Sequence, residues 1–253
     1  MATPCPPPTS FTAWLIETDR HQRPFAASAP LLRHNPLALP PYVTATTGMD
    51  ALTQAIEAYY GIDHRWVPAE GDLIYQGSNP MSDLLAERAI ELIAQNLRTA
   101  VHQGSNLQAR ANMMLGNIFS ALAFSNSGVS WVHAAAYPLA ERVLRPHGEL
   151  VGLLLPYGMR YNATAEPAKF ARIAELLGEP ANASEQQRTD GGIARVFGLL
   201  EDLGLPTKLS QLGLLRKDVE CIVDNSLTIE RLNRLNPRRL ERDALLRVLE
   251  DAL

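Results

Sequence analysis

Apolar side chains recur every three to five residues through most of the chain after Thr46, and this spacing predicts helices with one buried face. The segment between Asn79 and Gly104 shows the pattern most clearly. Asn79 is a favoured N-cap residue, and Pro80 is favoured at the first position of a helix. The apolar positions that follow are Leu85, Ala89, Leu92, Leu97 and Val101. We expect a helix there that ends at Gly104.

Similar patterns predict helices along the rest of the chain. The first begins near Thr46 and ends before Gly61, where a long polar loop follows. Another helix is expected to be capped by Ser105, and the helix that holds His133 comes next. The remaining helices are expected at about 148–161, 167–177, 190–203, 216–226 and 238–252.

The N-terminal part of the chain lacks the helical pattern. Residues 1–9 are rich in proline and are expected to be disordered. Residues 10–41 contain the apolar run Phe11–Thr18, which predicts a short strand, and a connector with several prolines. The predicted fold class is therefore mainly α, with an all-helical bundle domain over residues 42–253 and a short N-terminal β remnant.

Composition narrows the classes of function. The chain has 253 residues, 46% of them apolar, and a net charge of -4, so it can form a globular core and has no basic surface for nucleic acid. No segment reaches the roughly 18 uninterrupted apolar residues of a transmembrane helix. Residues 1–8 lack the charged and apolar regions of a secretory signal. We therefore expect a cytoplasmic protein with neither a membrane nor a nucleic-acid partner.

Four side chains offer the chemistry of a metal site. Asp50 and Gln54 are four residues apart, so they share one face of a helix, while His133 and His147 are expected on other helices. Two imidazoles, a carboxylate and a fourth donor suit divalent iron or zinc. Spacing alone leaves an alternative open, because buried histidines are often hydrogen-bonded core residues. Gln54 could equally be a helix-face amide whose hydrogen bonds go to neighbouring backbone groups.

Other polar residues near this set are interpreted separately. Tyr137 lies one helical turn beyond His133 and is expected in the same pocket, where its phenol could hydrogen-bond a substrate hydroxyl or simply pack beside Pro138. Glu57 shares the predicted helix of Asp50, and we interpret it as a structural residue. The histidines in polar or proline-rich surroundings are expected on the surface. They are His21, His34, His64 and His102.

Several segments of the chain resemble the helical C-terminal domain of the iron-containing alcohol dehydrogenases. They are Thr47–Tyr59, the stretch around His133, Pro146–Gly148, Leu153–Asn162 and Gly204–Leu209, and the likeness continues to the C-terminus. The resemblance implies a metal held by Asp50, Gln54, His133 and His147. The family pattern has histidine where this chain has Gln54, and an amide carbonyl is a weaker ligand for iron or zinc than imidazole.

Two details are similar to the hydroxyacid–oxoacid transhydrogenase branch of that family. One is the loop that ends in Tyr75–Asp83, and the other is Tyr137, where many alcohol dehydrogenases have a second histidine. The resemblance therefore implies that Tyr137 lies near the substrate. It also implies a small alcohol or aldehyde, or a hydroxy acid and oxo acid, as substrate.

The nucleotide-binding domain of the family is expected to be largely missing from this chain. Residues 10–41 resemble only its final strand and connector, and no glycine-rich turn follows a strand. The only Gly-Gly pair, Gly191 and Gly192, is placed in a polar loop before a helix. We therefore expect NAD(P) to bind only if a partner chain supplies that domain. Loss of a domain also predicts an uncovered apolar face and self-association.

The sequence leaves three functions open. The first is an oxidoreductase of this family, in which the metal acts as a Lewis acid on an alcohol or carbonyl oxygen. The second is a non-catalytic fragment, which Gln54 and the missing phosphate loop favour. The third is a cofactor-free, metal-dependent enzyme that uses only the remaining ligands.

Overall fold

The computed structural model describes residues 39–67 and 75–253. The predicted disordered tail (1–9), the strand at Phe11–Thr18 and nearly all of the proline-rich connector lie outside these residues. Within them the chain is helical, and an isolated bridge between Asp63 and Ser78 is the only β pairing of the described part. None of the described helices is long and apolar enough to cross a membrane.

The described residues form a succession of helices. The α-helices are α3 (Pro41–Tyr60), α4 (Pro80–His102), α5 (Leu107–Ser127), α6 (Trp131–Ala140), α7 (His147–Asn162), α8 (Pro167–Leu176), α9 (Glu185–Asp202), α10 (Arg216–Leu227), α11 (Glu230–Asn233) and α12 (Arg242–Asp251). Two short 3-10 helices, η1 (His64–Trp66) and η2 (Leu209–Leu212), lie between them. The prediction of a mainly α, all-helical domain is confirmed.

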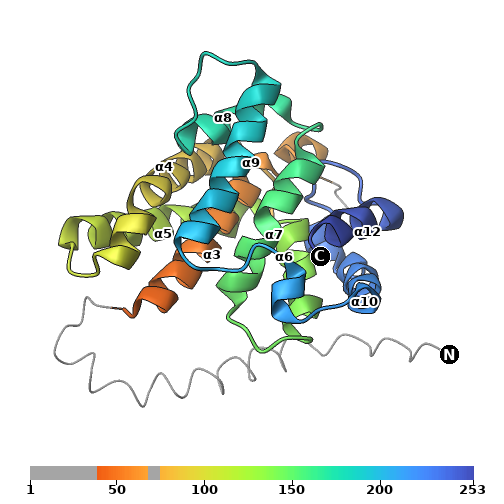
Figure 1. Ribbon diagram of the computed structural model, residues 1–253. Coiled ribbons are helices and arrows are strands. Elements are labelled where there is room, and N and C mark those ends of the chain that lie inside the picture. Colours follow the sequence, from red (N-terminus) through yellow and green to blue (C-terminus); the bar gives the residue numbers. More distant parts are fainter. Residues whose placement is uncertain (1–38, 68–74) are drawn as a thin grey trace.

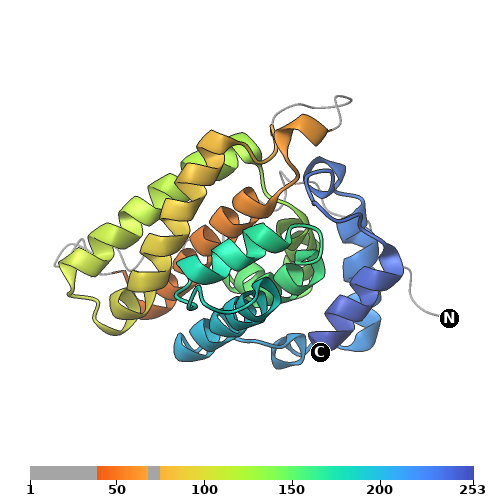
Figure 2. The same ribbon diagram turned by 90° about the horizontal axis from the view of Figure 1, so that it is seen from above.

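Helix α3 runs through the middle of the bundle (Figure 1). Helices α4 and α5 pack side by side against it, and α7 contacts it from another direction. Helices α10 and α12 lie at the opposite end from the α4–α5 pair, where α10 packs against α6 and α12 against α7 (Figure 2). Because α3, α6 and α7 occupy the centre, side chains from these three helices can meet inside the protein.

The core consists of two main clusters of buried apolar side chains. The first joins α3 and α4 to α8 and α9, and the second joins α6 and α7 to α10 and α12. In the first cluster the ring of Phe170 stacks on that of Tyr60, with 5.1 Å between the centroids. Nearly every residue of α3 from Thr44 to Tyr60 is buried, so this helix is surrounded by protein along most of its length.

Several predicted helix starts differ from the structure, including that of α12, which begins at Arg242 and not at about 238. Helix α3 begins at Pro41, not near Thr46, because proline at the first helical position needs no hydrogen-bond acceptor and already has helical φ. Helix α5 is capped by Asn106, whose side chain accepts a hydrogen bond from the Ala109 N–H, and not by Ser105.

Helix α9 corrects the interpretation of the Gly-Gly pair. The helix begins at Glu185, five residues before the predicted position, because Ser184 and Gln187 form a capping box at its N-terminus. Gly191 and Gly192 therefore lie inside α9 and not in a loop. A Cβ atom on Gly192 would be 2.7 Å from Cβ of Ala174, so the absence of a side chain lets α9 approach α8 closely.

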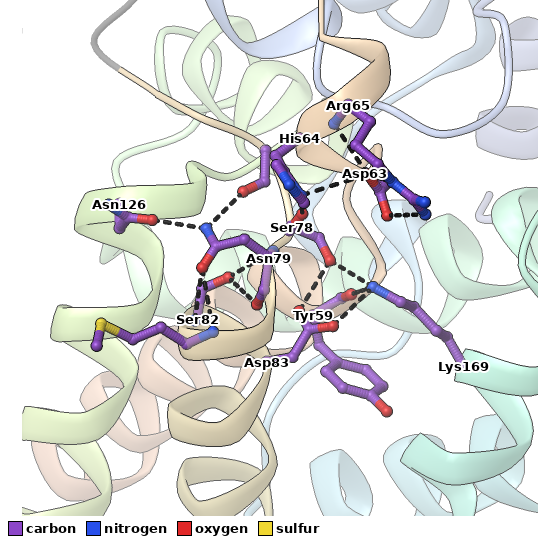
Figure 3. A network of polar contacts seen from close by, with 12 residues as sticks. Tyr59, Asp63, His64, Arg65, Ser78, Asn79, Ser82, Asp83, Asn126 and Lys169 are labelled. Atoms are coloured by element: carbon purple, nitrogen blue, oxygen red, sulfur yellow. Dashed lines mark hydrogen bonds and ion pairs between the residues drawn. The ribbon is translucent and has the colours of Figure 1, made fainter.

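The polar loop after α3 is anchored by a network of hydrogen bonds (Figure 3). Lys169 of α8 donates through Nζ to the Tyr59 carbonyl at 2.6 Å and to Oδ2 of Asp83 at 3.1 Å, and also to Ser78. Asn79 donates through Nδ2 to Asn126 Oδ1 at 2.7 Å. The network ties the end of α3 and the loop to α4, α5 and α8.

Replacing Asn79 by alanine is expected to lower the free energy of unfolding by about 1 kcal/mol. Its Oδ1 accepts hydrogen bonds from the Met81 and Ser82 N–H groups, and these donors would lose their partner. Urea unfolding monitored by circular dichroism measures the change. Ser105→Ala is the control, because Ser105 is exposed and lies outside the helix that Asn106 caps. An unchanged midpoint for the Asn79 variant would contradict the assigned cap.

Candidate metal centre

The centre of the bundle brings together side chains from three helices. Asp50 lies on α3, His133 on α6, and His147 is the first residue of α7. One ligand atom from each of the three lies within 4.8 Å of the others. The structure thus brings together three of the four residues of the metal site expected from the sequence, namely Asp50, His133 and His147.

The distances suit coordination of a small cation. Nε2 of His133 lies 3.6 Å and Nε2 of His147 lies 3.9 Å from Oδ1 of Asp50. Ligand atoms about 2.1 Å from a tetrahedral zinc or iron ion are about 3.4 Å apart, so small side-chain movements would complete the site. At 3.6 Å and above these contacts are too long to be hydrogen bonds.

Two of the donor atoms are buried without a conventional partner. Oδ1 of Asp50 and Nε2 of His133 have no hydrogen-bond partner among the residues that the structure describes. Buried polar atoms are normally hydrogen-bonded, because leaving one unsatisfied costs about 1–3 kcal/mol. A divalent cation bound between them would satisfy both atoms. The residues present therefore fit the metal that the sequence predicts.

The protonation states of the site follow from burial and from neighbouring charges. Burial opposes ionisation of Asp50, but the two imidazoles outweigh it and hold the pKa of Asp50 below its usual value. Burial lowers the pKa of His147 to about 4, so this imidazole is neutral at pH 7. Burial also disfavours charge on His133, but Glu57 and Asp50 raise its pKa to about 9. A metal at Nε2 of His133 would therefore have to displace a proton.

Glu57, interpreted from the sequence as a structural residue, is in direct contact with the candidate ligand His133. Its side chain is fully buried on α3, and its Oε2 accepts a short hydrogen bond from Nδ1 of His133. Burial opposes its charge, but His133 and further donors keep the pKa of Glu57 below its usual value. A signal was present in the sequence: Glu57 lies seven residues after Asp50, on the same helix face, within an apolar run.

Tyr137, one helical turn after His133, lies beside the candidate ligand His147. Its ring stacks on the ring of His147, with centroids 6.0 Å apart and an interplanar angle of 15°. Its hydroxyl accepts a hydrogen bond from Arg231 at 3.4 Å. Burial raises the pKa of Tyr137, so the phenol remains protonated at neutral pH and is suited to donate a hydrogen bond. A role with substrate stays a prediction.

The remaining candidate ligand, Gln54, and the histidines expected on the surface lie in different surroundings. Gln54 follows Asp50 by one turn on α3 and is half-buried, and its ligation of a metal stays a prediction. His64 and His102 are exposed. Their rings contact the backbone carbonyls of Ser78 and Asp202, respectively, and neither belongs to the cluster of candidate ligands. His21 and His34 lie outside the described residues.

The start of α7 is pressed against α3, and this contact places His147. A Cβ atom on Gly148 would be 2.0 Å from the Thr46 carbonyl oxygen and 3.1 Å from Cβ of Asp50. The hydroxyl of Tyr42, on the first turn of α3, donates to Oε2 of buried Glu149 at 2.5 Å. Glycine at position 148 thus permits the close approach that brings the His147 imidazole to Asp50.

Comparisons with known proteins point to one family. The profile described as "Fe-containing alcohol dehydrogenase family, C-terminal" matches residues 44–253. The 1,3-propanediol dehydrogenase of Klebsiella pneumoniae is 41% identical over 189 residues, which is 74% of this chain and 45% of that protein. The mitochondrial hydroxyacid-oxoacid transhydrogenase of Bos taurus is 31% identical over 238 residues, 86% of this chain and 51% of that one. The chain thus spans about half the length of the curated relatives it matches.

Solved structures agree with the sequence comparisons. The crystal structure of a 1,3-propanediol oxidoreductase superposes with a TM-score of 0.77 at 37% identity, over 86% of this chain and 53% of that chain. An alcohol dehydrogenase from Oenococcus oeni gives a TM-score of 0.77 at 33% identity with the same coverage of both chains. The helical bundle described above is therefore similar to the corresponding part of these proteins.

Proposed function

Because the chain belongs to the iron-containing alcohol dehydrogenase family, we propose that its bundle is the metal-binding part of an oxidoreductase. Asp50, His133 and His147 are proposed to hold divalent iron or zinc, with Gln54 as a fourth donor. The observation that carries this proposal is the convergence of three ligand atoms within 4.8 Å at the centre of the bundle. The proposed activity is interconversion of an alcohol and a carbonyl compound.

The residues of the chain would each contribute to this chemistry. When bound, the metal supplies Lewis acidity toward the substrate oxygen, and a nicotinamide supplies the hydride acceptor or donor. Asp50 is ionised and compensates part of the cation's charge, while His147 is neutral and offers a lone pair. Tyr137 would donate a hydrogen bond to the substrate beside His147.

Substrate and partner are also proposed on the basis of the relatives. The similar proteins include a 1,3-propanediol dehydrogenase and a hydroxyacid-oxoacid transhydrogenase, so we propose a small alcohol or aldehyde, or a hydroxy acid and oxo acid. NAD(P) would be held by a nucleotide-binding domain supplied by another chain or by a longer form of this one. Exposed apolar residues of α5, such as Met114 and Ile118, could contact that domain whether it lies on another chain or on a longer form of this one.

A second candidate is a non-catalytic member of the family. The observation that favours it is Gln54, which stands where the family pattern has histidine and which weakens any four-ligand site. This candidate predicts little metal binding.

Metal loading tests the proposal. We expect the purified chain, loaded anaerobically with iron(II) or with zinc(II), to retain one metal ion after desalting, as measured by elemental analysis. His147→Ala removes a ligand and is expected to lose most of it. Metal content in the wild type no higher than in the variant would contradict the proposed site and favour the non-catalytic candidate.

A further inference from the structure

Glu57 is a buried carboxylate whose surroundings explain why it is tolerated. It is fully buried on α3 between Ile56 and Ala58, which are also fully buried. A buried charge is costly unless it is hydrogen-bonded and paired. The carboxylate must therefore be compensated by specific donors.

The two oxygens of Glu57 have different partners. Oε1 lies 2.7 Å from Oγ of Ser130, 2.9 Å from the Val132 backbone nitrogen and 3.1 Å from the hydroxyl of Tyr60. Oε2 faces only Nδ1 of His133 among the contacts of this carboxylate in the described chain. Oε1 thus anchors the side chain to the N-terminus of α6, and Oε2 is directed at the imidazole.

An ionised carboxylate can only accept hydrogen bonds, so Nδ1 of His133 must carry the proton. Once the ring has lost its second proton, as metal binding requires, the lone pair is on Nε2, the atom 3.6 Å from Oδ1 of Asp50. We propose that Glu57 is a positioning residue that fixes the tautomer and the ring orientation of His133, so that Nε2 faces the metal. This inference rests on the proposed metal site.

Glu57→Gln tests the inference with almost no change of shape. The amide oxygen can take the place of Oε1 and keep the contacts with Ser130, Val132 and Tyr60. The amide NH2 group would then face Nδ1 of His133 and donate to it, which moves the ring proton to Nε2. We expect the dissociation constant for zinc(II) to rise about 10–100-fold, the range found when groups that orient metal ligands are altered.

Glu87→Gln is the matched control. The Glu87 carboxylate also accepts a hydrogen bond from a tyrosine of α3, Tyr59 at 2.8 Å, and pairs with Arg172 on α8, but it has no contact with the metal centre. The Glu87→Gln variant is expected to bind zinc with the same affinity as the wild type. Thermal unfolding of the metal-free proteins verifies that both variants are folded.

The position of the ring proton is measured by 15N NMR of histidine-labelled protein. We expect Nδ1 of His133 to carry a proton in the wild type, with and without zinc, and to be unprotonated in metal-free Glu57→Gln, where the ring proton lies on Nε2. Wild-type affinity in a folded Glu57→Gln variant, or an unprotonated Nδ1 in the wild type, would overturn the inference. If the Glu57→Gln variant does not fold, the protonation of Nδ1 in the wild-type spectrum alone tests the inference. A wild type that binds no zinc would contradict the proposed function, while the Nδ1 signal would still test Glu57.

Discussion

Gly148→Ala is expected to lower the free energy of unfolding by about 1–3 kcal/mol and to weaken metal binding in the same molecule. The added methyl group would lie 2.0 Å from the Thr46 carbonyl oxygen, which is backbone and cannot rotate away. The first turn of α7 must therefore move off α3. Because His147 is the preceding residue, its imidazole moves away from Asp50. The distance between these two ligands increases, and the affinity for the metal falls.

A second glycine provides the control for this prediction. Gly198 also lies inside a helix, α9, but a Cβ atom there would meet nothing within 4 Å. Gly198→Ala is expected to stabilise the protein by about 0.4–1 kcal/mol and to leave zinc affinity unchanged. Urea unfolding and zinc titration of both variants measure the difference. If Gly148→Ala matches the wild type in both, α7 is not held by this contact.

The helices were predictable wherever local chemistry marks their ends. Helix α4 begins at Pro80 after an Asn79 cap, as expected, and α8 at Pro167 is also in the predicted place. The start of α9 was missed because its first turns are polar and exposed, so an apolar period cannot reveal them. Only the Ser184–Gln187 capping box marks that end, and it is a short signal.

The candidate metal centre was predictable only in part from the residues themselves. The helical period places Asp50 and Gln54 on one face of a helix. It does not predict that α6 and α7 pack against α3 beside these two residues. The resemblance to a known family supplied this pairing. Glu57 was missed because its partner, His133, is 76 residues away in the sequence. Contacts at such separation depend on helix packing, which the pattern of a single sequence does not reveal.

Gln54→His is expected to tighten zinc binding by at least about tenfold. The substitution introduces the histidine that the resemblance implies at this position and replaces a neutral amide oxygen by imidazole, a stronger ligand for zinc and iron. Changes to groups that merely orient ligands already alter affinity about 10–100-fold, so a gained ligand should do no less. Gln54 lies one turn after Asp50 on α3 and is half-buried, so the new ring would be on the helix face that carries the carboxylate.

Competition with a coloured chelator measures the affinities, and Gln95→His is the control. Gln95 is exposed on α4, so a histidine there adds an imidazole without adding a ligand to the centre. A gain confined to Gln54→His means that the side chain at position 54 faces the metal and that the natural glutamine weakens the site. Equal affinities for Gln54→His and the wild type would mean that position 54 lies outside the coordination sphere. The metal would then be held by Asp50, His133 and His147, and the departure from the family pattern would not by itself argue against activity.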